Sequence, residues 1–300
     1  MCNLLLGAAI GDALGLPFEG TLSNNKELID WDCLSYIGSI YHKLNPGQYS
    51  DDTIMQICVA ESLIENSGFN PDLLSKKYVD VITSNPNRGY GGTTKLAISN
   101  LINKKHWSES GVNGSFGNGT AMRAPPFGVY FRNDLDALIA AVKIDSAITH
   151  VSDDAEAGAL AIALATYYAV NKDTSNLIHK ISEFLPDCKT KSNLQNIKDS
   201  NIKKSNPILV FKALGTSANV RESVPAVLYA FLKFDNYMDG VIAIIRAGRD
   251  TDSNACMLGS LFAARDGCSS IPYHLINDVE DRDRLIKLDS LLYRNQLFPR

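Results

Sequence analysis

The stretch AGRDTDSNACMLG, residues 247–259, places Asp250 and Asp252 two positions apart, directly before an apolar run. Asp, Ser and Thr are favoured at helix N-termini, and a carboxylate there gains about 0.3–1 kcal/mol from the helix dipole. Read alone, the stretch is therefore the acidic start of a buried helix. It could also be half of a metal site, and a second acidic cluster elsewhere in the chain would be needed to complete it.

A second cluster of this kind is present in YSDDTIMQICVAES, residues 49–62, where Ser50, Asp51 and Asp52 precede another apolar run. Capping explains one acid per helix, but not two acids before such an apolar helix, twice. If both helix starts converge, two charges about 4 Å apart at an effective dielectric near 20 repel by about 4 kcal/mol. A bound dication would relieve that repulsion. Carboxylate and hydroxyl oxygens favour Mg²⁺, Mn²⁺ or Ca²⁺ over zinc.

Two common motifs are excluded by inspection. DTDSNACMLGSL, from residue 250, begins like a calcium-binding EF-hand loop, but its sixth residue is Ala255 instead of Gly and its twelfth is Leu261 instead of Glu. The sequence contains no GxxxxGK[ST] phosphate loop. The paired acids therefore match neither motif.

The helical texture of the chain predicts an all-α fold. Of the 300 residues, 45% are hydrophobic and 21% charged, which is ordinary globular composition. Several segments at helix lengths are apolar nearly all the way round, as in helices buried inside a large bundle; they span 53–66, 136–148, 156–170, 224–234, 238–248 and 254–267. No series of alternating strands is visible, and GVYF (128–131) is expected to be a connector. Residues 185–207 are polar and predict a surface excursion, so residues 1–300 are expected to form a single domain.

Charge and cysteine usage limit the partners and the compartment. The formal charge of −4 gives no basic field for strong nucleic-acid binding. The six cysteines (Cys2, Cys33, Cys58, Cys188, Cys256 and Cys268) show no zinc spacing and predict reduced thiols in the cytoplasm. No run reaches the roughly 18 apolar residues of a membrane helix, so no membrane partner is expected.

Other stretches are ambiguous when taken alone. GAAIGDALGLPFEG (7–20) has glycines four apart, a spacing that lets helices approach closely, and ends at Glu19, for which a solvated loop acid is the simpler interpretation. SFGNGTAMRAPPFG (115–128) resembles a glycine turn whose backbone N–H groups could hold a phosphate, although such loops are commonly just turns. His150 lies at a predicted helix junction, where a packed residue is more common than a catalyst. The other histidines, including His42, occupy no recurrent context.

Together and in this order, these segments resemble the ADP-ribosylglycohydrolase family, of the dinitrogenase-reductase-activating glycohydrolase type. The matching segments are GAAIGDALGLPFEG, YSDDT, NRGYGGTT, SFGNGTAMRAPPFG, ITHVSDDAEAGALA and GRDTDSNA, which run from residue 7 to about 264. The resemblance implies an all-α orthogonal multi-helix bundle with two Mg²⁺ or Mn²⁺ ions. It also implies removal of ADP-ribose at the anomeric carbon of the distal ribose from an arginine- or serine-linked protein or another ADP-ribosyl conjugate, by a protein that is monomeric.

The resemblance also implies roles for individual residues. The implied metal ligands are Ser50, Asp51, Asp52, Asp250, Asp252 and Ser253. The implied catalytic residues are Glu19, Asp51, Asp52 and Asp250. The implied substrate-binding residues are Gly89, Tyr90, Gly91, Gly92, Ser115, Phe116, Gly117, Asn118, Gly119, Met122 and His150.

Two departures from the family pattern stand out. Ser50 and Ser253 replace threonines and keep the ligating hydroxyl, whereas Arg249 replaces a glycine and puts the substrate preference in question. A different two-metal hydrolase such as a phosphatase, a catalytically silent ADP-ribose-binding module and a structural protein of the same fold stay open as alternatives.

Overall fold

The computed structural model describes residues 3–21, 35–197 and 199–294 and confirms the all-α prediction. The α-helices are α1 (Leu4–Gly15), α2 (Asp51–Asn66), α3 (Pro71–Ser84), α4 (Gly92–Ile102), α5 (Trp107–Ser110), α6 (Pro125–Tyr130), α7 (Leu135–Thr149), α8 (Asp153–Val170), α9 (Leu177–Ser182), α10 (Lys189–Gln195), α11 (Asp199–Ile202), α12 (Pro207–Leu214), α13 (Val220–Lys233), α14 (Tyr237–Ala247), α15 (Thr251–Asp266), α16 (Tyr273–Asp278) and α17 (Arg282–Arg294). A 3₁₀ turn, η1 (Leu16–Phe18), extends α1, and the two-residue strands β1 (Val112–Asn113) and β2 (His150–Val151) pair in parallel.

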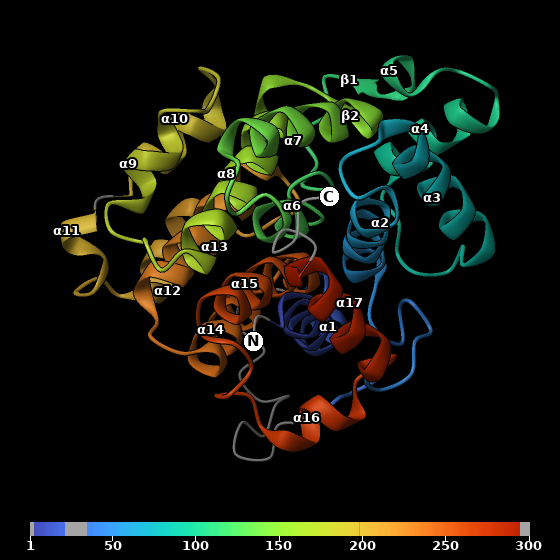
Figure 1. Ribbon diagram of the computed structural model, residues 1–300. Coiled ribbons are helices and arrows are strands. Elements are labelled where there is room, and N and C mark those ends of the chain that lie inside the picture. The colour runs from blue at the N-terminus through green and yellow to red at the C-terminus, as the bar shows by residue number, and fades with distance from the viewer. Residues whose placement is uncertain (1–2, 22–34, 198, 295–300) are drawn as a thin grey trace.

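The centre of the fold is the close contact between α1 and α15, which lie side by side in Figure 1. All twelve residues of α1 are buried. A Cβ added to Gly11 would lie 2.2 Å from the carbonyl oxygen of Ala255, and one added to Gly15 would lie 2.3 Å from that of Thr251. These glycines therefore let the two backbones touch, as their four-residue spacing predicts. The contact places the C-terminal end of α1 beside the N-terminal end of α15.

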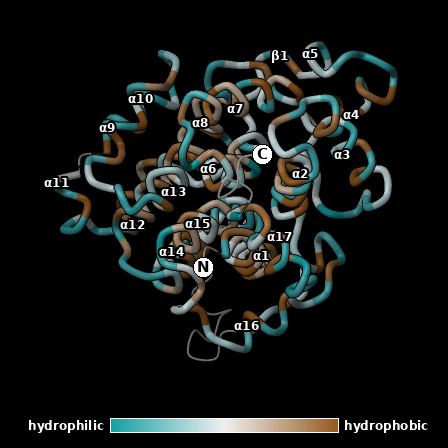
Figure 2. Tube along the Cα trace, in the orientation of Figure 1, coloured by the Kyte–Doolittle hydropathy of each residue, from teal (hydrophilic) through white to brown (hydrophobic). Residues whose placement is uncertain are grey.

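Around this pair, the remaining helices complete a single hydrophobic cluster that extends from Leu4 to Leu292. The long helix α8 packs against α6, α7, α13 and α15. Figure 2 shows hydrophobic residues along the central helices and hydrophilic residues on the outer loops. The single-domain organisation of residues 1–300 stays a prediction.

One local prediction was wrong, and another is refined. Residues 128–131 are not a connector, because Gly128 to Tyr130 belong to α6, which begins with two prolines that are compatible with a first helical turn. Residues 185–207 are more than a surface excursion: they contain α10 and α11, and Leu194 and Ile202 are buried. A few apolar side chains spaced along a polar segment are enough to dock it.

Within the described part of the chain, the thiols of Cys58, Cys188, Cys256 and Cys268 are free. Cys2 and Cys33 lie outside the described residues. No helix among those the structure describes has the length and hydropathy required to cross a membrane.

Candidate metal centre

The N-termini of α2 and α15 converge, so the two acidic clusters form one site. The Ser253 hydroxyl donates to Asp52 Oδ1 at 3.0 Å, across 201 sequence positions. The Ser50 hydroxyl donates to Asp52 Oδ2 at 2.9 Å and accepts the Asp52 N–H at 3.2 Å. Ser50 is thus the N-cap of α2, whereas Asp250 occupies the N-cap position of α15 without a capping hydrogen bond from its side chain. Helix capping and a shared site are therefore both present: Ser50 caps α2, and the carboxylates of the two clusters lie close together.

A third element, α1, contributes Asp12, which the sequence analysis passed over. Asp12 is fully buried, and its Oδ1 accepts the Ser50 N–H at 3.0 Å. Oxygen atoms of Asp12, Asp52 and Asp252 lie within 4.8 Å of one another. A carboxylate inside an otherwise apolar helix was the available signal, because a buried charge requires partners.

The loop before α15 connects the centre to its surroundings. Asn118 Nδ2 donates to Asp250 Oδ2 at 2.6 Å, which ties the 115–119 glycine loop to the acidic cluster. Arg249 has a left-handed backbone (φ 68°), its N–H donates to Thr21 O at 2.7 Å, and its carbonyl accepts the Gly20 N–H at 2.6 Å. These two bonds hold the turn that carries Glu19 beside the start of α15. The Arg249 side chain is exposed.

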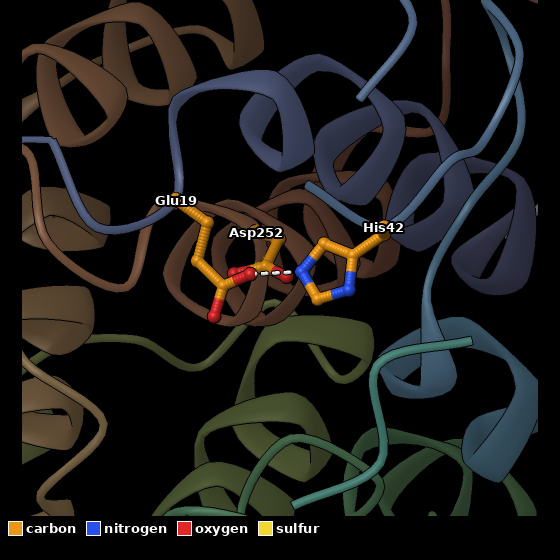
Figure 3. Close-up of side chains that lie close together, drawn as sticks. All are labelled: Glu19, His42 and Asp252. Atoms are coloured by element: carbon orange, nitrogen blue, oxygen red, sulfur yellow. Dashed lines mark hydrogen bonds and ion pairs between the residues drawn. The ribbon is translucent and has the colours of Figure 1, made fainter. Parts of the chain in front are cut away.

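Glu19 reaches into the cluster together with a residue that the sequence analysis set aside, His42 (Figure 3). His42 Nε2 contacts Glu19 Oε2, and one ligand atom from each of Glu19, His42 and Asp252 lies within 4.8 Å of the others. Asp252 therefore belongs to both groups of potential ligands. No local pattern around His42 predicts this contact, because the turn that carries it is positioned only by the tertiary fold.

Burial and mutual repulsion make it costly for the clustered carboxylates to carry their charges. Burial, reinforced by Asp52 and Asp250, raises the pKa of Asp252 well above its usual range. Burial and neighbouring acids also raise the pKa of Asp51 and Asp52, and burial raises that of Asp250 to about 6. Asp252 Oδ1 is buried and has no hydrogen-bond partner among the described residues. An unpartnered buried oxygen amid clustered acids fits a hard dication with oxygen ligands, such as Mg²⁺ or Mn²⁺.

The two glycine loops that were expected to bind substrate lie next to each other. The hydroxyls of Thr93 and Ser115 are 3.1 Å apart and join the loops. A Cβ added to Gly89 would lie 3.1 Å from Asp51 Oδ1, and one added to Gly119 would lie 2.9 Å from the His150 ring. Glycine is needed at Gly89 on conformational grounds too, since its φ is 101°. The loops therefore run from the metal-ligand cluster to His150.

The other expected substrate-binding residues differ in accessibility. Tyr90 and Met122 are buried and present little surface to a ligand. Phe116 is 42% exposed, and the Arg221 guanidinium lies 3.7 Å from the centre of its ring. His150 is buried, and burial together with the nearby Arg123 charge lowers its pKa to about 3, so its ring is neutral at physiological pH. His150 is therefore a neutral hydrogen-bonding group here.

A buried ion pair that the sequence analysis missed supports the 115–119 loop. Arg123 is fully buried, and its Nε donates to Asp145 Oδ2 at 2.9 Å. Its Nη1 donates to Gly119 O at 3.3 Å and to the Thr149 hydroxyl at 2.9 Å. The Thr149 hydroxyl in turn lies 2.8 Å from His150 Nδ1. One guanidinium thus fixes both the loop and the histidine beside it.

Comparisons with known proteins agree with this fold and identify its family. The ADP-ribosylglycohydrolase family model matches residues 1–298, so the chain belongs to the ADP-ribosylglycohydrolase family. It is 30% identical to a protein of Archaeoglobus fulgidus, over 97% of this chain and 95% of that protein. It is 29% identical to ADP-ribosylhydrolase ARH3 of Danio rerio, over 96% and 88% of the two chains.

Two further comparisons bear on activity and fold. ADP-ribosylarginine hydrolase Tri1 of Serratia proteamaculans is 25% identical to this chain, over 96% of this chain and 77% of Tri1. A chain of the solved ADP-ribosylglycohydrolase-related protein complex superposes with a TM-score of 0.80 at 22% identity, covering 98% of this chain and 96% of that chain. The structural match establishes the fold, and the family and its named members support ADP-ribosyl hydrolase activity.

Proposed function

We propose that this protein removes ADP-ribose from a modified target by metal-assisted hydrolysis at the anomeric carbon of the distal ribose. One observation carries the proposal: Asp252 is shared by both groups of potential metal ligands, and its Oδ1 is buried without a partner in the described part of the chain. A silent binding module or a structural protein would have no need for acids clustered at such electrostatic cost.

The proposed centre holds two dications, Mg²⁺ or Mn²⁺. The proposed ligands are Ser50, Asp51, Asp52, Asp250, Asp252 and Ser253. Asp12 orients the start of α2 by accepting the N–H groups of Ser50 and Thr53. A bound dication supplies Lewis acidity that orients the ribose hydroxyls and lowers the pKa of a water.

Acidic side chains are then proposed to transfer the proton and to stabilise the developing charge. Glu19 has a side chain that is 32% exposed, at the edge of the cluster, and in this proposal it accepts a proton from the attacking water. The water oxygen bonds to the anomeric carbon as the bond from that carbon to the target breaks, and the proton passes to the departing target. Asp51, Asp52 and Asp250 stabilise the positive charge that develops on the ribose. We infer direct displacement by water, because in this proposal the clustered aspartates hold the metal ions and Glu19 acts as the base.

The diphosphate of ADP-ribose is proposed to bind along the glycine loops. Gly91 precedes α4, and Gly92 is its first residue, so their N–H groups lie at the start of an eleven-residue helix, an arrangement suited to anions. Ser115 to Gly119 would form the opposite wall, and Phe116 offers an exposed aromatic face. Neutral His150 would donate or accept a hydrogen bond without adding charge.

The substrate is proposed to be an arginine- or serine-linked ADP-ribosylated protein or another ADP-ribosyl conjugate. The names of ARH3 and Tri1, an ADP-ribosylhydrolase and an ADP-ribosylarginine hydrolase, support this class. The free thiols of the four described cysteines support a reducing compartment such as the cytoplasm. We propose that the protein acts as a monomer.

The decisive experiment measures ADP-ribose release from defined arginine-, serine- and nucleic-acid-linked substrates, free polymer and O-acetyl-ADP-ribose, with Mg²⁺, Mn²⁺ or chelator. We expect metal-dependent release from at least one linkage. Tight binding of ADP-ribose without release from any substrate would favour the silent binding module, and release of inorganic phosphate would favour a phosphatase.

A further inference from the structure

His42 occupies a defined position over the acidic cluster. It lies in a tight turn closed by the backbone bridge between Ser39 and Leu44, in which the His42 N–H donates to the Ser39 hydroxyl at 3.3 Å. Its ring packs edge-on against Tyr41 at 4.7 Å, and its side chain is 12% exposed. The turn thus holds the imidazole in place before any ligand arrives.

The imidazole is aimed at metal-ligating atoms from two other elements (Figure 3). Glu19 comes from the turn after η1, and Asp252 comes from the first turn of α15. Ligand atoms around a first-row dication lie about 2.0–2.2 Å from the ion, so any two lie within about 4.4 Å of each other. The three ligand atoms here lie within 4.8 Å of one another, so the geometry needs only side-chain adjustments, including separation of the His42 and Glu19 atoms that are in contact.

A hydrogen bond between His42 and Glu19 accounts for only part of this arrangement. It leaves Asp252 Oδ1 buried without a partner among the residues described, in a residue that shares a group of potential ligands with Glu19. A dication would offset the negative charges of both Glu19 and Asp252.

We propose that His42 Nε2 is a nitrogen ligand of one metal position, together with Asp252 and one carboxylate oxygen of Glu19, whose other oxygen remains available to accept the proton of the attacking water. This inference deepens the proposed function and rests on it. One position of the centre is then all-oxygen, around Asp52 and Asp252, and the other is mixed nitrogen and oxygen. Imidazole suits first-row transition metals such as iron, nickel and zinc better than magnesium, whose preferred ligands are oxygen atoms. The mixed position therefore selects a transition-metal dication over Mg²⁺.

The test is pulsed electron paramagnetic resonance of the full chain loaded with one equivalent of Mn²⁺, which detects modulation from a coordinated imidazole ¹⁴N. We expect this modulation in the wild type, its loss in His42→Ala, and its retention in His106→Ala. His106 is a matched control, because its side chain is 58% exposed and its partners are Asp72 and Ser108, away from the centre. We also expect His42→Ala to reduce the preference for Mn²⁺ over Mg²⁺ by at least about 10-fold in equilibrium binding.

A second variant separates ligation from positioning. The amide of His42→Gln can still donate a hydrogen bond to Glu19 but cannot supply an imidazole nitrogen. If His42 only positions Glu19, this variant restores the wild-type metal preference; if His42 is a ligand, the preference stays reduced. Circular dichroism and thermal unfolding verify that both variants fold.

Several results would overturn the inference: wild-type protein that binds Mn²⁺ without nitrogen modulation, modulation that persists in His42→Ala, or wild-type protein that binds no Mn²⁺. The proposed function is tested separately, by measuring ADP-ribose release from the same samples. Metal-dependent release without nitrogen modulation removes His42 from the centre and leaves the hydrolase intact. Nitrogen modulation without release from any substrate keeps His42 as a metal ligand and contradicts the proposed hydrolase activity.

Discussion

Asp12 and Thr53 are joined by two hydrogen bonds to a single carboxylate oxygen: Asp12 Oδ2 accepts the Thr53 N–H at 3.1 Å and the Thr53 hydroxyl at 2.7 Å. The other oxygen, Oδ1, accepts the N–H of Ser50. Asp12 on α1 therefore satisfies N–H groups at the start of α2, as a capping residue does, although it lies 41 positions away from Thr53. The orientation of Asp51 and Asp52 depends on it.

We expect Asp12→Asn to weaken metal binding by about 10–100-fold, the range found when a residue that orients metal ligands is replaced. The amide nitrogen cannot accept a hydrogen bond, so one of these donors loses its partner at a cost of about 1–3 kcal/mol. Isothermal titration with Mn²⁺ measures the first effect and urea unfolding the second. Unchanged affinity in a folded variant would show that Asp12 does not organise the centre.

We expect Asp252→Ala to lower ADP-ribose release by more than about 100-fold, or about 2.7 kcal/mol of transition-state stabilisation. The metal-free protein should become more stable at the same time, because a crowded buried carboxylate is removed. Thermal unfolding with and without Mn²⁺ checks both halves: the ion should stabilise the wild type and have little effect on the variant. Full metal-dependent turnover by the variant would refute the assignment of Asp252.

We expect Gly11→Ala to destabilise the fold by about 1–3 kcal/mol, because the new Cβ would lie 2.2 Å from the Ala255 carbonyl oxygen and force α1 away from α15. Metal affinity should fall as well, since these helices carry Asp12 and Asp252. Gly92→Ala is the control for stability: an added Cβ there meets nothing within 4 Å. Urea denaturation compares the two, and equal midpoints would show that α1 and α15 tolerate separation.

We expect stability to depend on pH through Asp289, whose carboxylate accepts the N–H groups of Leu5 at 2.9 Å and Leu6 at 3.2 Å. Burial raises the pKa of Asp289 to about 8 from the ordinary 3.8, although these hydrogen bonds oppose the shift. Because the folded-state pKa of Asp289 is the higher one, its protonation favours the folded state. This contribution to stability is fully present below pH 3.8 and is lost as the pH rises toward 8.

Between those values, the free energy of unfolding should fall by up to about 1.4 kcal/mol per pH unit. Asp289→Asn removes this titration while keeping the size of the side chain. Urea unfolding of both proteins at pH 5, 6, 7 and 8 gives the two slopes. Parallel slopes would mean that Asp289 titrates alike in the folded and unfolded states.

The helical architecture and the convergence of residues 50–52 with 250–253 follow from patterns visible in the sequence. Apolar periodicity identifies the buried helices, and the repeated acid pairs indicate a shared site. His42 and Asp12 were not predicted as site residues for different physical reasons. His42 reaches the cluster only through the tertiary placement of its turn, whereas Asp12 was visible as a lone charge in an apolar stretch but lacked the paired acid that marked the other two clusters.

The burial of α1 also affects how the protein is made. Thr251 donates a hydrogen bond to the Gly15 carbonyl across 236 positions, so the partner of α1 is synthesised long after α1 itself. At about 5–20 residues per second, roughly 12–50 s pass before α15 is available. During that time a segment destined for the interior is exposed on an unfinished chain. Ribosome-associated chaperones should therefore bind this nascent chain. Premature termination before residue 251 should leave an aggregation-prone, inactive fragment.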